Sequence, residues 1–190
     1  MRRYQTIDLT LLALIVCGLE AAAHAALGFF PTEAFAFSVV LPVCLIVMMR
    51  WGAWGLLHAA LGGLVYSLIN GGGFEAALVY GLGSLAVAGN LLWFRLASKR
   101  RVRDSAGLSA AFAATGYLFM ATGRALMAAL VTGTAFFGCW VRLMSIEALS
   151  GAMAVVVLLV ARRRDKNGSV FEDQREYLAR LAAGEDTTCA

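Results

Sequence analysis

The sequence lacks the motifs on which most soluble enzymes depend. Its four cysteines, Cys17, Cys44, Cys139 and Cys189, include no close pair, so neither a zinc spacing nor a disulfide framework is indicated. No phosphate-binding loop, no metal-binding motif and no pair of aqueous carboxylates is present. We therefore expect that the chain is not an enzyme and that it carries no metal and no cofactor.

Long apolar runs take the place of those motifs. Hydrophobic residues make up 61% of the 190 residues, whereas soluble domains contain about 45–50%. Six runs are long enough, or nearly so, to cross a hydrocarbon core of about 30 Å. They are Asp8–Phe30, Glu33–Met49, Trp51–Asn70, Phe74–Leu96, Gly107–Val131 and Phe136–Ala161. This pattern predicts an all-α polytopic membrane protein with six transmembrane helices.

The basic residues alternate between the connections of these runs. Arg2 and Arg3 precede the first run, Arg50 lies between the second and third, and clusters begin at Arg95 and at Arg162. The other three connections contain no Lys or Arg. The positive-inside rule then places both termini in the cytoplasm of a bacterial-type cell membrane. Because the basic clusters flank spans, orientation and anionic lipid of the bilayer explain them better than nucleic acid does.

The chain is expected to contain one membrane domain, residues 1–164, and a short cytoplasmic tail, residues 165–190. The tail begins where the apolar run ends and has the pattern of one short peripheral helix. All other connections are very short, so soluble catalytic machinery has no place in them. Function must therefore lie within the membrane, at its faces or in partner subunits.

Several charged side chains fall inside the apolar runs, where each costs about 2.5–3.5 kcal/mol on insertion scales and usually faces a cavity or a partner. At a rise of 1.5 Å per residue, three of them lie about 9–10 Å below the outer end of their spans: His24, Arg124 and Arg142. Glu20 and Glu147 lie deeper, near the middle of the membrane. We expect the first three residues to share one level of a polar site in the outer half, with the two acids below them.

Helical spacing refines this expectation. Glu20 and His24 are four residues apart and share a face, and so do Trp140 and Glu147, seven residues apart. Arg142 and Glu147 are separated by about 140° around their helix, so each needs a partner elsewhere. Glu20 is available to one arginine, and a ligand carboxylate or phosphate could serve the other.

Aromatic side chains at the same outer level could form the walls of a pocket: Tyr66, Tyr80, Phe137 and Trp140. The alternative is that the two acids and two arginines neutralise each other as structural ion pairs. The other polar groups of the spans have simpler expected roles. His24 and His58 lie at different depths, which argues against a haem site, and we expect Asn90 and His58 to form interhelical hydrogen bonds.

Residues 37–72, "FSVVLPVCLIVMMRWGAWGLLHAALGGLVYSLINGG", consist of a short proline-containing span, a basic turn and a Gly- and Ala-rich helix that ends at a Gly-rich loop. This stretch, the opening "TIDLTLLALIVCG" and the six short-looped spans resemble the substrate-binding S component of energy-coupling factor (ECF) vitamin transporters. The resemblance covers residues 5–162 and implies a pocket for a vitamin or vitamin precursor, built from the outer halves of the helices.

The resemblance also implies partners, namely a transmembrane coupling subunit and two cytoplasmic ATPases. In that family an AxxxA surface on the first span contacts the coupling subunit, and the matching positions here are Ala13, Cys17, Ala21 and Ala25. Cysteine at position 17 departs from the pattern, in which a small alanine is expected. The implied site residues are Glu20, His24, Tyr66, Arg124, Trp140, Arg142 and Glu147.

Two functions therefore remain open on the sequence. One is a membrane-embedded binding subunit for uptake of a vitamin-like solute, which is released inside by ATP hydrolysis on partner subunits. The other is a structural or anchoring subunit of a larger membrane complex, in which the intramembrane charges are ion pairs that hold the bundle together.

Overall fold

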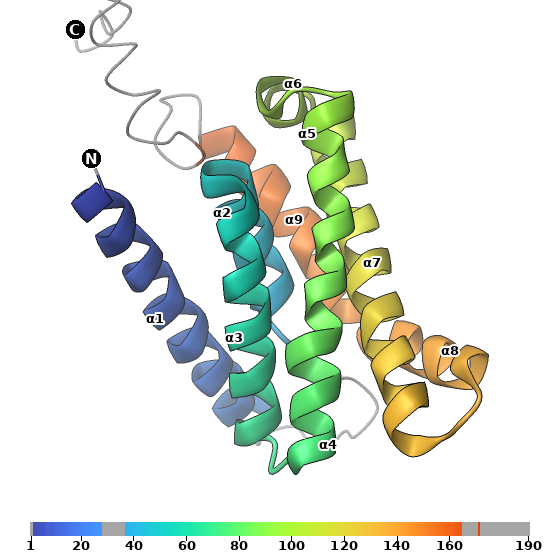
Figure 1. The fold of residues 1–190 in the computed structure, drawn as a ribbon. Coiled ribbons are helices and arrows are strands. Elements are labelled where there is room, and N and C mark those ends of the chain that lie inside the picture. The colour runs from blue at the N-terminus through green and yellow to red at the C-terminus, as the bar shows by residue number, and fades with distance from the viewer. Residues whose placement is uncertain (1, 28–36, 165–170, 172–190) are drawn as a thin grey trace, which may run out of the picture.

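The computed structural model describes residues 2–27, 37–164 and 171, and all statements about structure refer to these residues. Within them the fold is helical, with no strand. The long N-terminal helix α1 comprises Arg2–Leu27, and α2 (Val40–Trp51) is followed by a short 3₁₀ turn, η1 (Gly52–Trp54), and by α3 (Gly55–Ile69). The chain passes repeatedly between the two ends of one bundle (Figure 1).

The middle of the chain forms one continuous helix from Phe74 to Leu96. Its winding changes along its length, and its parts are α4 (Phe74–Ala77), a π-helical segment η2 (Leu78–Leu82), a 3₁₀ segment η3 (Gly83–Leu91) and α5 (Leu92–Leu96). The short helix α6 (Lys99–Asp104) leads into α7 (Ala106–Thr132). Ser105 caps α7 by accepting a hydrogen bond from the Leu108 amide, and Gly133 ends the helix in the left-handed conformation.

The last helical stretch is broken. Helix α8 (Phe136–Ile146) and helix α9 (Ala148–Arg164) meet at Glu147 with a bend of 53°. The predicted run Phe136–Ala161 is therefore two helices rather than one straight span. Figure 1 shows α8 leaving the bundle at an angle, beside the end of α7.

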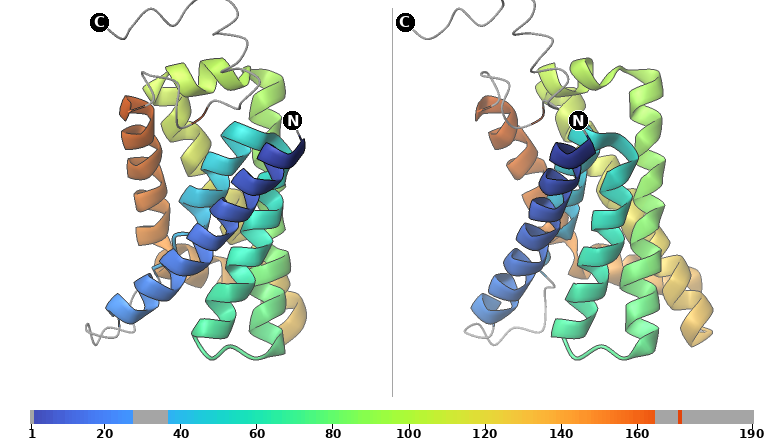
Figure 2. Two further views of the ribbon diagram at one scale, coloured as in Figure 1. Left: turned by 90° about the vertical axis from the view of Figure 1, so that its left-hand side faces the viewer. Right: turned by 60° about the vertical axis from the view of Figure 1, so that its left-hand side comes forward.

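Four helical stretches are long and apolar enough to cross a membrane, or five if α8 and α9 count as one broken span. One of the four, Val40–Ile69, contains a reversal of the chain. A Cβ atom placed on Gly55 would lie 2.2 Å from the Met48 side chain, and one on Gly62 would lie 2.8 Å from the side chain of Val40. Helices α2 and α3 are therefore antiparallel neighbours, joined at Gly52, whose φ of 67° favours glycine (Figure 2).

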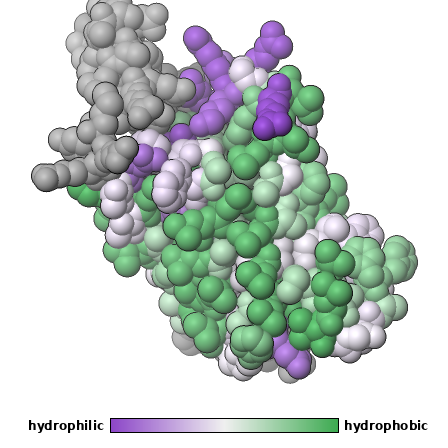
Figure 3. All heavy atoms as spheres, in the orientation of Figure 1, coloured by the Kyte–Doolittle hydropathy of each residue, from purple (hydrophilic) through white to green (hydrophobic). Residues whose placement is uncertain are grey.

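The basic connections meet at one end of the bundle, which we call the basic end. Arg50 lies 3.3 Å from Asp8 of α1, Lys99 donates to the Arg50 carbonyl at 3.5 Å, and Arg162 donates to the Asp104 carbonyl at 2.7 Å. Figure 3 shows hydrophilic side chains gathered at this end above a largely hydrophobic surface. The turn after α3 and the connection between α7 and α8 form the opposite end (Figure 1).

The outer surface between the ends is rich in large apolar side chains. Exposed examples occur on every long helix and include Leu14, Leu68, Leu130 and Val156. Exposed apolar surface on this scale is expected when lipid rather than water surrounds the helices. The described part of the chain is thus compatible with a membrane protein.

The expected interhelical hydrogen bonds of Asn90 and His58 are confirmed. The Asn90 amide donates to the Phe112 carbonyl of α7 at 2.7 Å, and a ring nitrogen of His58 lies 3.0 Å from the Leu9 carbonyl of α1. Both side chains are buried. The predicted tail, residues 165–190, lies outside the described residues except for Phe171, which is buried against the core of the bundle.

Candidate functional site

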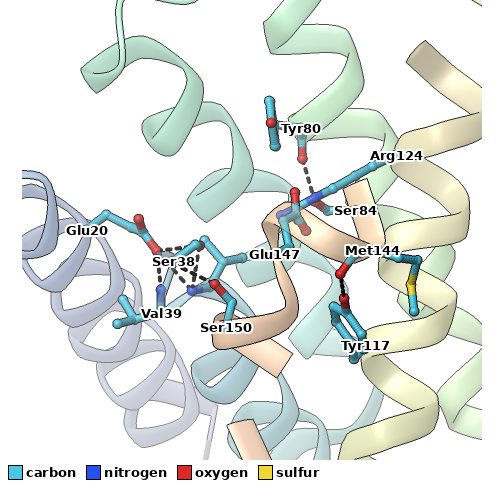
Figure 4. A network of polar contacts seen from close by, with 11 residues as sticks. Glu20, Ser38, Val39, Tyr80, Ser84, Tyr117, Arg124, Met144, Glu147 and Ser150 are labelled. Atoms are coloured by element: carbon cyan, nitrogen blue, oxygen red, sulfur yellow. Dashed lines mark hydrogen bonds and ion pairs between the residues drawn. The ribbon is translucent and has the colours of Figure 1, made fainter. Parts of the chain in front are cut away.

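A buried ion pair joins α7 to the break between α8 and α9. Nη1 of Arg124 lies 2.7 Å from Oε2 of Glu147, and the two side chains are 2% and 5% exposed. Burial of two charges is costly unless they are paired and hydrogen-bonded. Glu147 lies at the helix break, so its side chain turns into the bundle toward Arg124 (Figure 4).

The continuous helix 74–96 supplies the other contacts of Arg124. Nε of Arg124 donates to the Ser84 hydroxyl at 3.0 Å, and Ser84 in turn donates to the Tyr80 carbonyl. The guanidinium carbon lies 5.0 Å from the centroid of the Tyr80 ring, a distance typical of a cation–π contact. Tyr66 of α3 packs on Tyr80 with ring centroids 4.8 Å apart, so two aromatic rings border the cation.

Glycine residues allow the helix 74–96 and α7 to approach each other closely. A Cβ atom on Gly83 would lie 2.7 Å from the Arg124 Cα atom, and one on Gly123 would lie 2.2 Å from the Gly83 carbonyl oxygen. No side chain fits at such distances. The glycine pair therefore lets the backbones touch and sets the position from which Arg124 reaches Ser84.

Two polar atoms of the pair have no hydrogen-bond partner among the described residues. They are Nη2 of Arg124, a donor, and Oε1 of Glu147, an acceptor. Buried polar atoms are nearly always satisfied in folded proteins, and each exception calls for an explanation such as a water molecule or a ligand. The ion pair thus leaves one donor and one acceptor for a further molecule.

Glu20 of α1 forms a second buried network beside the first (Figure 4). Its Oε1 atom accepts hydrogen bonds from the Ser38 hydroxyl at 2.8 Å and from the amides of Val39 and Val40 at 2.6 and 2.9 Å. The Ser38 amide donates to the Ser150 hydroxyl of α9 at 2.9 Å. Glu20 was expected to neutralise an arginine, but its observed contacts are with the start of α2.

The length of α2 explains this contact. Twelve residues at a rise of 1.5 Å span about 18 Å, which is well short of a hydrocarbon core of about 30 Å. In a bundle that crosses a membrane, the first amides of α2 therefore lie within hydrocarbon, where unsatisfied backbone groups cost several kcal/mol each. Glu20 satisfies two of them from a neighbouring helix.

We expect Glu20→Leu to destabilise the protein by about 1–3 kcal/mol, because it leaves buried amide donors unsatisfied. Glu20→Gln keeps an oxygen acceptor at the same place and should therefore lose much less stability. Unfolding of the two variants in the same detergent would measure the difference. Equal losses would show that the negative charge of Glu20, rather than its role as an acceptor, matters to the fold.

Among the described residues, neither His24 nor Arg142 has a hydrogen bond or ion pair with Arg124 or Glu147. His24 lies near the opposite end, where its Nδ1 atom is 3.2 Å from the side-chain oxygen of Asn70. Arg142 is exposed on α8. Arg142 nevertheless lies close enough to Tyr80 for its charge to act on the phenol group. That His24 and Arg142 share a binding site with Arg124 therefore stays a prediction.

Trp140 also lies apart from Arg124. Its indole nitrogen donates to Thr122 of α7 at 3.0 Å, and its ring stacks on Phe137. Thr122 and Arg124 are two residues apart on α7, which is about 200° around the helix, and Thr122 is exposed whereas Arg124 is buried. Of the residues expected in the site, the structure brings together Arg124, Glu147 and Tyr66, with Glu20 alongside.

Sequence reasoning missed the hydroxyl groups that complete the networks. Ser84, Ser38 and Ser150 are buried and hydrogen-bonded, and the Tyr117 hydroxyl donates to the Met144 carbonyl just before the helix break. A serine in an apolar run is a weak signal, since it can bond to its own helix. One available signal was the spacing of Glu147 and Ser150. Residues three apart in a helix share a face, so this spacing placed a hydroxyl group on the same face as the buried acid.

The four residues expected to contact a partner divide into two pairs. Ala21 and Ala25 are exposed on α1, whereas Ala13 and Cys17 are half-buried. Ala13 borders a groove between α1 and α3, and Cys17 packs against the core of the bundle. The surface that matches the AxxxA pattern is therefore open only in its second half.

Comparison with known proteins does not assign this chain to a family. No family model, no curated protein and no solved structure matches it. Within the described residues, no group of three or more His, Cys, Asp or Glu side chains is placed to hold a metal ion. The geometry of the site must therefore carry the functional argument.

Proposed function

We propose that the chain is a substrate-binding subunit of a membrane uptake system, of the kind found in ECF transporters. One observation carries this proposal. Nη2 of Arg124 and Oε1 of Glu147 are buried at a broken helix and have no hydrogen-bond partner among the described residues. Binding sites of membrane transporters are typically formed where helices are discontinuous and polar groups face inward.

The proposal includes six membrane crossings, with α2 and α3 as separate crossings and α8–α9 as one broken crossing. Support comes from the reversal at Gly52 and from the basic end, which gathers Arg50, Lys99 and Arg162. By the positive-inside rule that end faces the cytoplasm of a bacterial-type cell membrane, with both termini. The buried ion pair then lies toward the outer side, from which a substrate would arrive.

The substrate that suits this site is uncharged. Arg124 is already neutralised by Glu147 at 2.7 Å, and the carboxylate of Glu20 lies in the neighbouring network. An anion would therefore meet the carboxyl groups of Glu147 and Glu20. A further cation, Arg142, is exposed on α8 and acts on the site through its electrostatic interaction with Tyr80. A vitamin-sized molecule with an amide-like donor and acceptor could bond to Oε1 of Glu147 and Nη2 of Arg124 while its ring packs near Tyr80 and Tyr66.

Release inside the cell would require partners. In the proposed system a transmembrane coupling subunit contacts the bundle, and two cytoplasmic ATPases supply the energy. Of the candidate spans, α1 is the least buried within the bundle, and its exposed residues Ala21 and Ala25 allow close approach of another helix. This exposed helix supports a partner contact.

A specific observation also favours the structural alternative. The Arg124–Glu147 pair and the Glu20 network link α1, α2, α7 and α9 across the bundle. Such links would suit a subunit that only holds a larger complex together. Ligand binding by the isolated chain distinguishes the two functions.

We expect an uncharged vitamin-like compound to raise the melting temperature of the detergent-purified chain. A ligand at 100 times its Kd stabilises the folded state by about 2.7 kcal/mol. Tyr80→Leu removes the ring beside Arg124 and should abolish the shift, whereas Phe137→Leu, on the exposed part of α8, should retain it. A panel of neutral and acidic vitamins without any shift, together with no copurifying compound by mass spectrometry, would favour the structural alternative.

A further inference from the structure

A groove on the outer surface of the bundle lies between α1 and α3. Its volume is about 470 Å³, within the range of about 300–1,000 Å³ that is usual for small-molecule sites. Leu9 and Ala13 of α1 line one side, and Leu57 and Leu61 of α3 line the other, with Trp54 near the start of α3. This groove is separate from the Arg124–Glu147 pair.

The groove occupies the half of the bundle next to the basic end. Its lining on α1 begins at Gln5 and ends at Ala13, a length of about 12 Å at 1.5 Å per residue. Half of a hydrocarbon core measures about 15 Å. The groove therefore matches the depth of one leaflet and runs along the direction of a lipid chain.

The chemistry of the lining favours hydrocarbon. Trp54 and Leu57 are 48% and 57% exposed, so the groove presents large apolar surfaces to its surroundings. His58 also lines it, but the ring nitrogens of this buried side chain lie 3.0 Å from the Trp54 and Leu9 carbonyl oxygens. The polar atoms of the imidazole are thus engaged with backbone, which leaves an apolar occupant as the better match.

The end of the groove is positively charged. Arg50 at the end of α2 lies 3.3 Å from Asp8, the residue before the lining residue Leu9, and Lys99 donates to the Arg50 carbonyl. This cluster of described side chains contains two cations, Arg50 and Lys99, and one anion, Asp8. Basic clusters beside a membrane span attract anionic lipid headgroups.

We infer that this groove binds one acyl chain of an anionic phospholipid, with the headgroup at the basic end. The apolar lining holds the chain, and Arg50 and Lys99 at the basic end select the headgroup. The inference does not depend on the proposed transport function. The inference concerns a lipid that is bound at a specific site of the folded protein, not the lipids that exchange freely around it.

Trp54 provides the test, because its indole borders the groove. The full-length protein is reconstituted in phosphatidylcholine vesicles that contain either brominated phosphatidylglycerol or brominated phosphatidylcholine, and tryptophan fluorescence is recorded. Subtraction of the signal of Trp54→Phe isolates the contribution of Trp54. We expect brominated phosphatidylglycerol to quench Trp54 several-fold more strongly than brominated phosphatidylcholine at equal content.

Two variants locate the effect. Ala13→Phe fills the groove and should abolish the headgroup preference, while Leu14→Phe changes the neighbouring residue, which is 64% exposed and outside the groove, and should retain it. Equal quenching of the wild type by both lipids would overturn the inference, whatever the variants do. A headgroup preference that survives Ala13→Phe would also overturn it. The same holds if neither lipid quenches Trp54, because a protein segment would then cover the groove.

Discussion

Replacement of Glu147 by leucine should cost about 3–5 kcal/mol of folding free energy. This is the usual loss when one partner of a buried ion pair is removed. Arg124 is 2% exposed, and its other contacts are the hydroxyl of Ser84 and the ring of Tyr80. Neither carries a charge that could replace the carboxylate. Chemical unfolding of wild type and variant in the same detergent would measure the loss.

Removal of both charges should be far less harmful than removal of one. Arg124→Met combined with Glu147→Leu leaves no unpaired charge, so the double variant should regain most of the stability lost by Glu147→Leu alone. Arg142→Gln is the matched control, because this arginine is exposed on α8, and it should change stability by about 0.5 kcal/mol or less. Additive losses in the double variant would contradict the pairing of Arg124 with Glu147.

Gly123→Ala should destabilise the protein by about 1–3 kcal/mol, which is typical of an overpacked core. The new methyl group would lie 2.2 Å from the Gly83 carbonyl oxygen and 2.3 Å from the Ala86 side chain. The two helices must separate to accept it, and this movement also withdraws Arg124 from Ser84. The loss occurs although alanine favours a helix over glycine by about 1 kcal/mol.

Gly18→Ala provides the control for this experiment, because a methyl group at Gly18 of α1 meets nothing within 4 Å. It should leave the melting temperature unchanged or raise it slightly. Gly83→Ala should resemble Gly123→Ala, and the two losses should not add, since both substitutions force the same separation. A Gly123→Ala protein as stable as Gly18→Ala would show that the helices do not touch at this point.

The apolar runs of the sequence predicted the bounds of two long helices best. The fourth run, Phe74–Leu96, has the bounds of the continuous helix, and the fifth, Gly107–Val131, differs from α7 by one residue at each end. Long apolar runs specify a helix through their own backbone hydrogen bonds, and Gly133 supplies a strong end signal. Asn90 was also interpreted correctly, since a lone amide in an apolar helix needs a partner on a neighbour.

The sequence predicted the site less well, because the depth of each side chain was inferred along straight helices. That inference placed Arg142 level with Arg124. The bend of 53° at Glu147 turns α8 aside and leaves Arg142 exposed, while Glu147, expected near the middle of the membrane, becomes the partner of Arg124. No proline marks this bend, so local sequence did not reveal it. A short second span was expected, but the sequence did not show that its helix begins only at Val40, and the role of Glu20 as an acceptor for amides was therefore missed.

The cap that Glu20 provides for α2 bears on how the protein is made. Ribosomes deliver α1 to the membrane before α2, so the carboxyl group is already in place when the amides of Val39 and Val40 arrive. A helix of twelve residues is too short to settle alone across hydrocarbon, but it can do so against a neighbour that accepts its free donors. The acceptor on α1 is thus synthesised before the donors at the start of α2 that it satisfies.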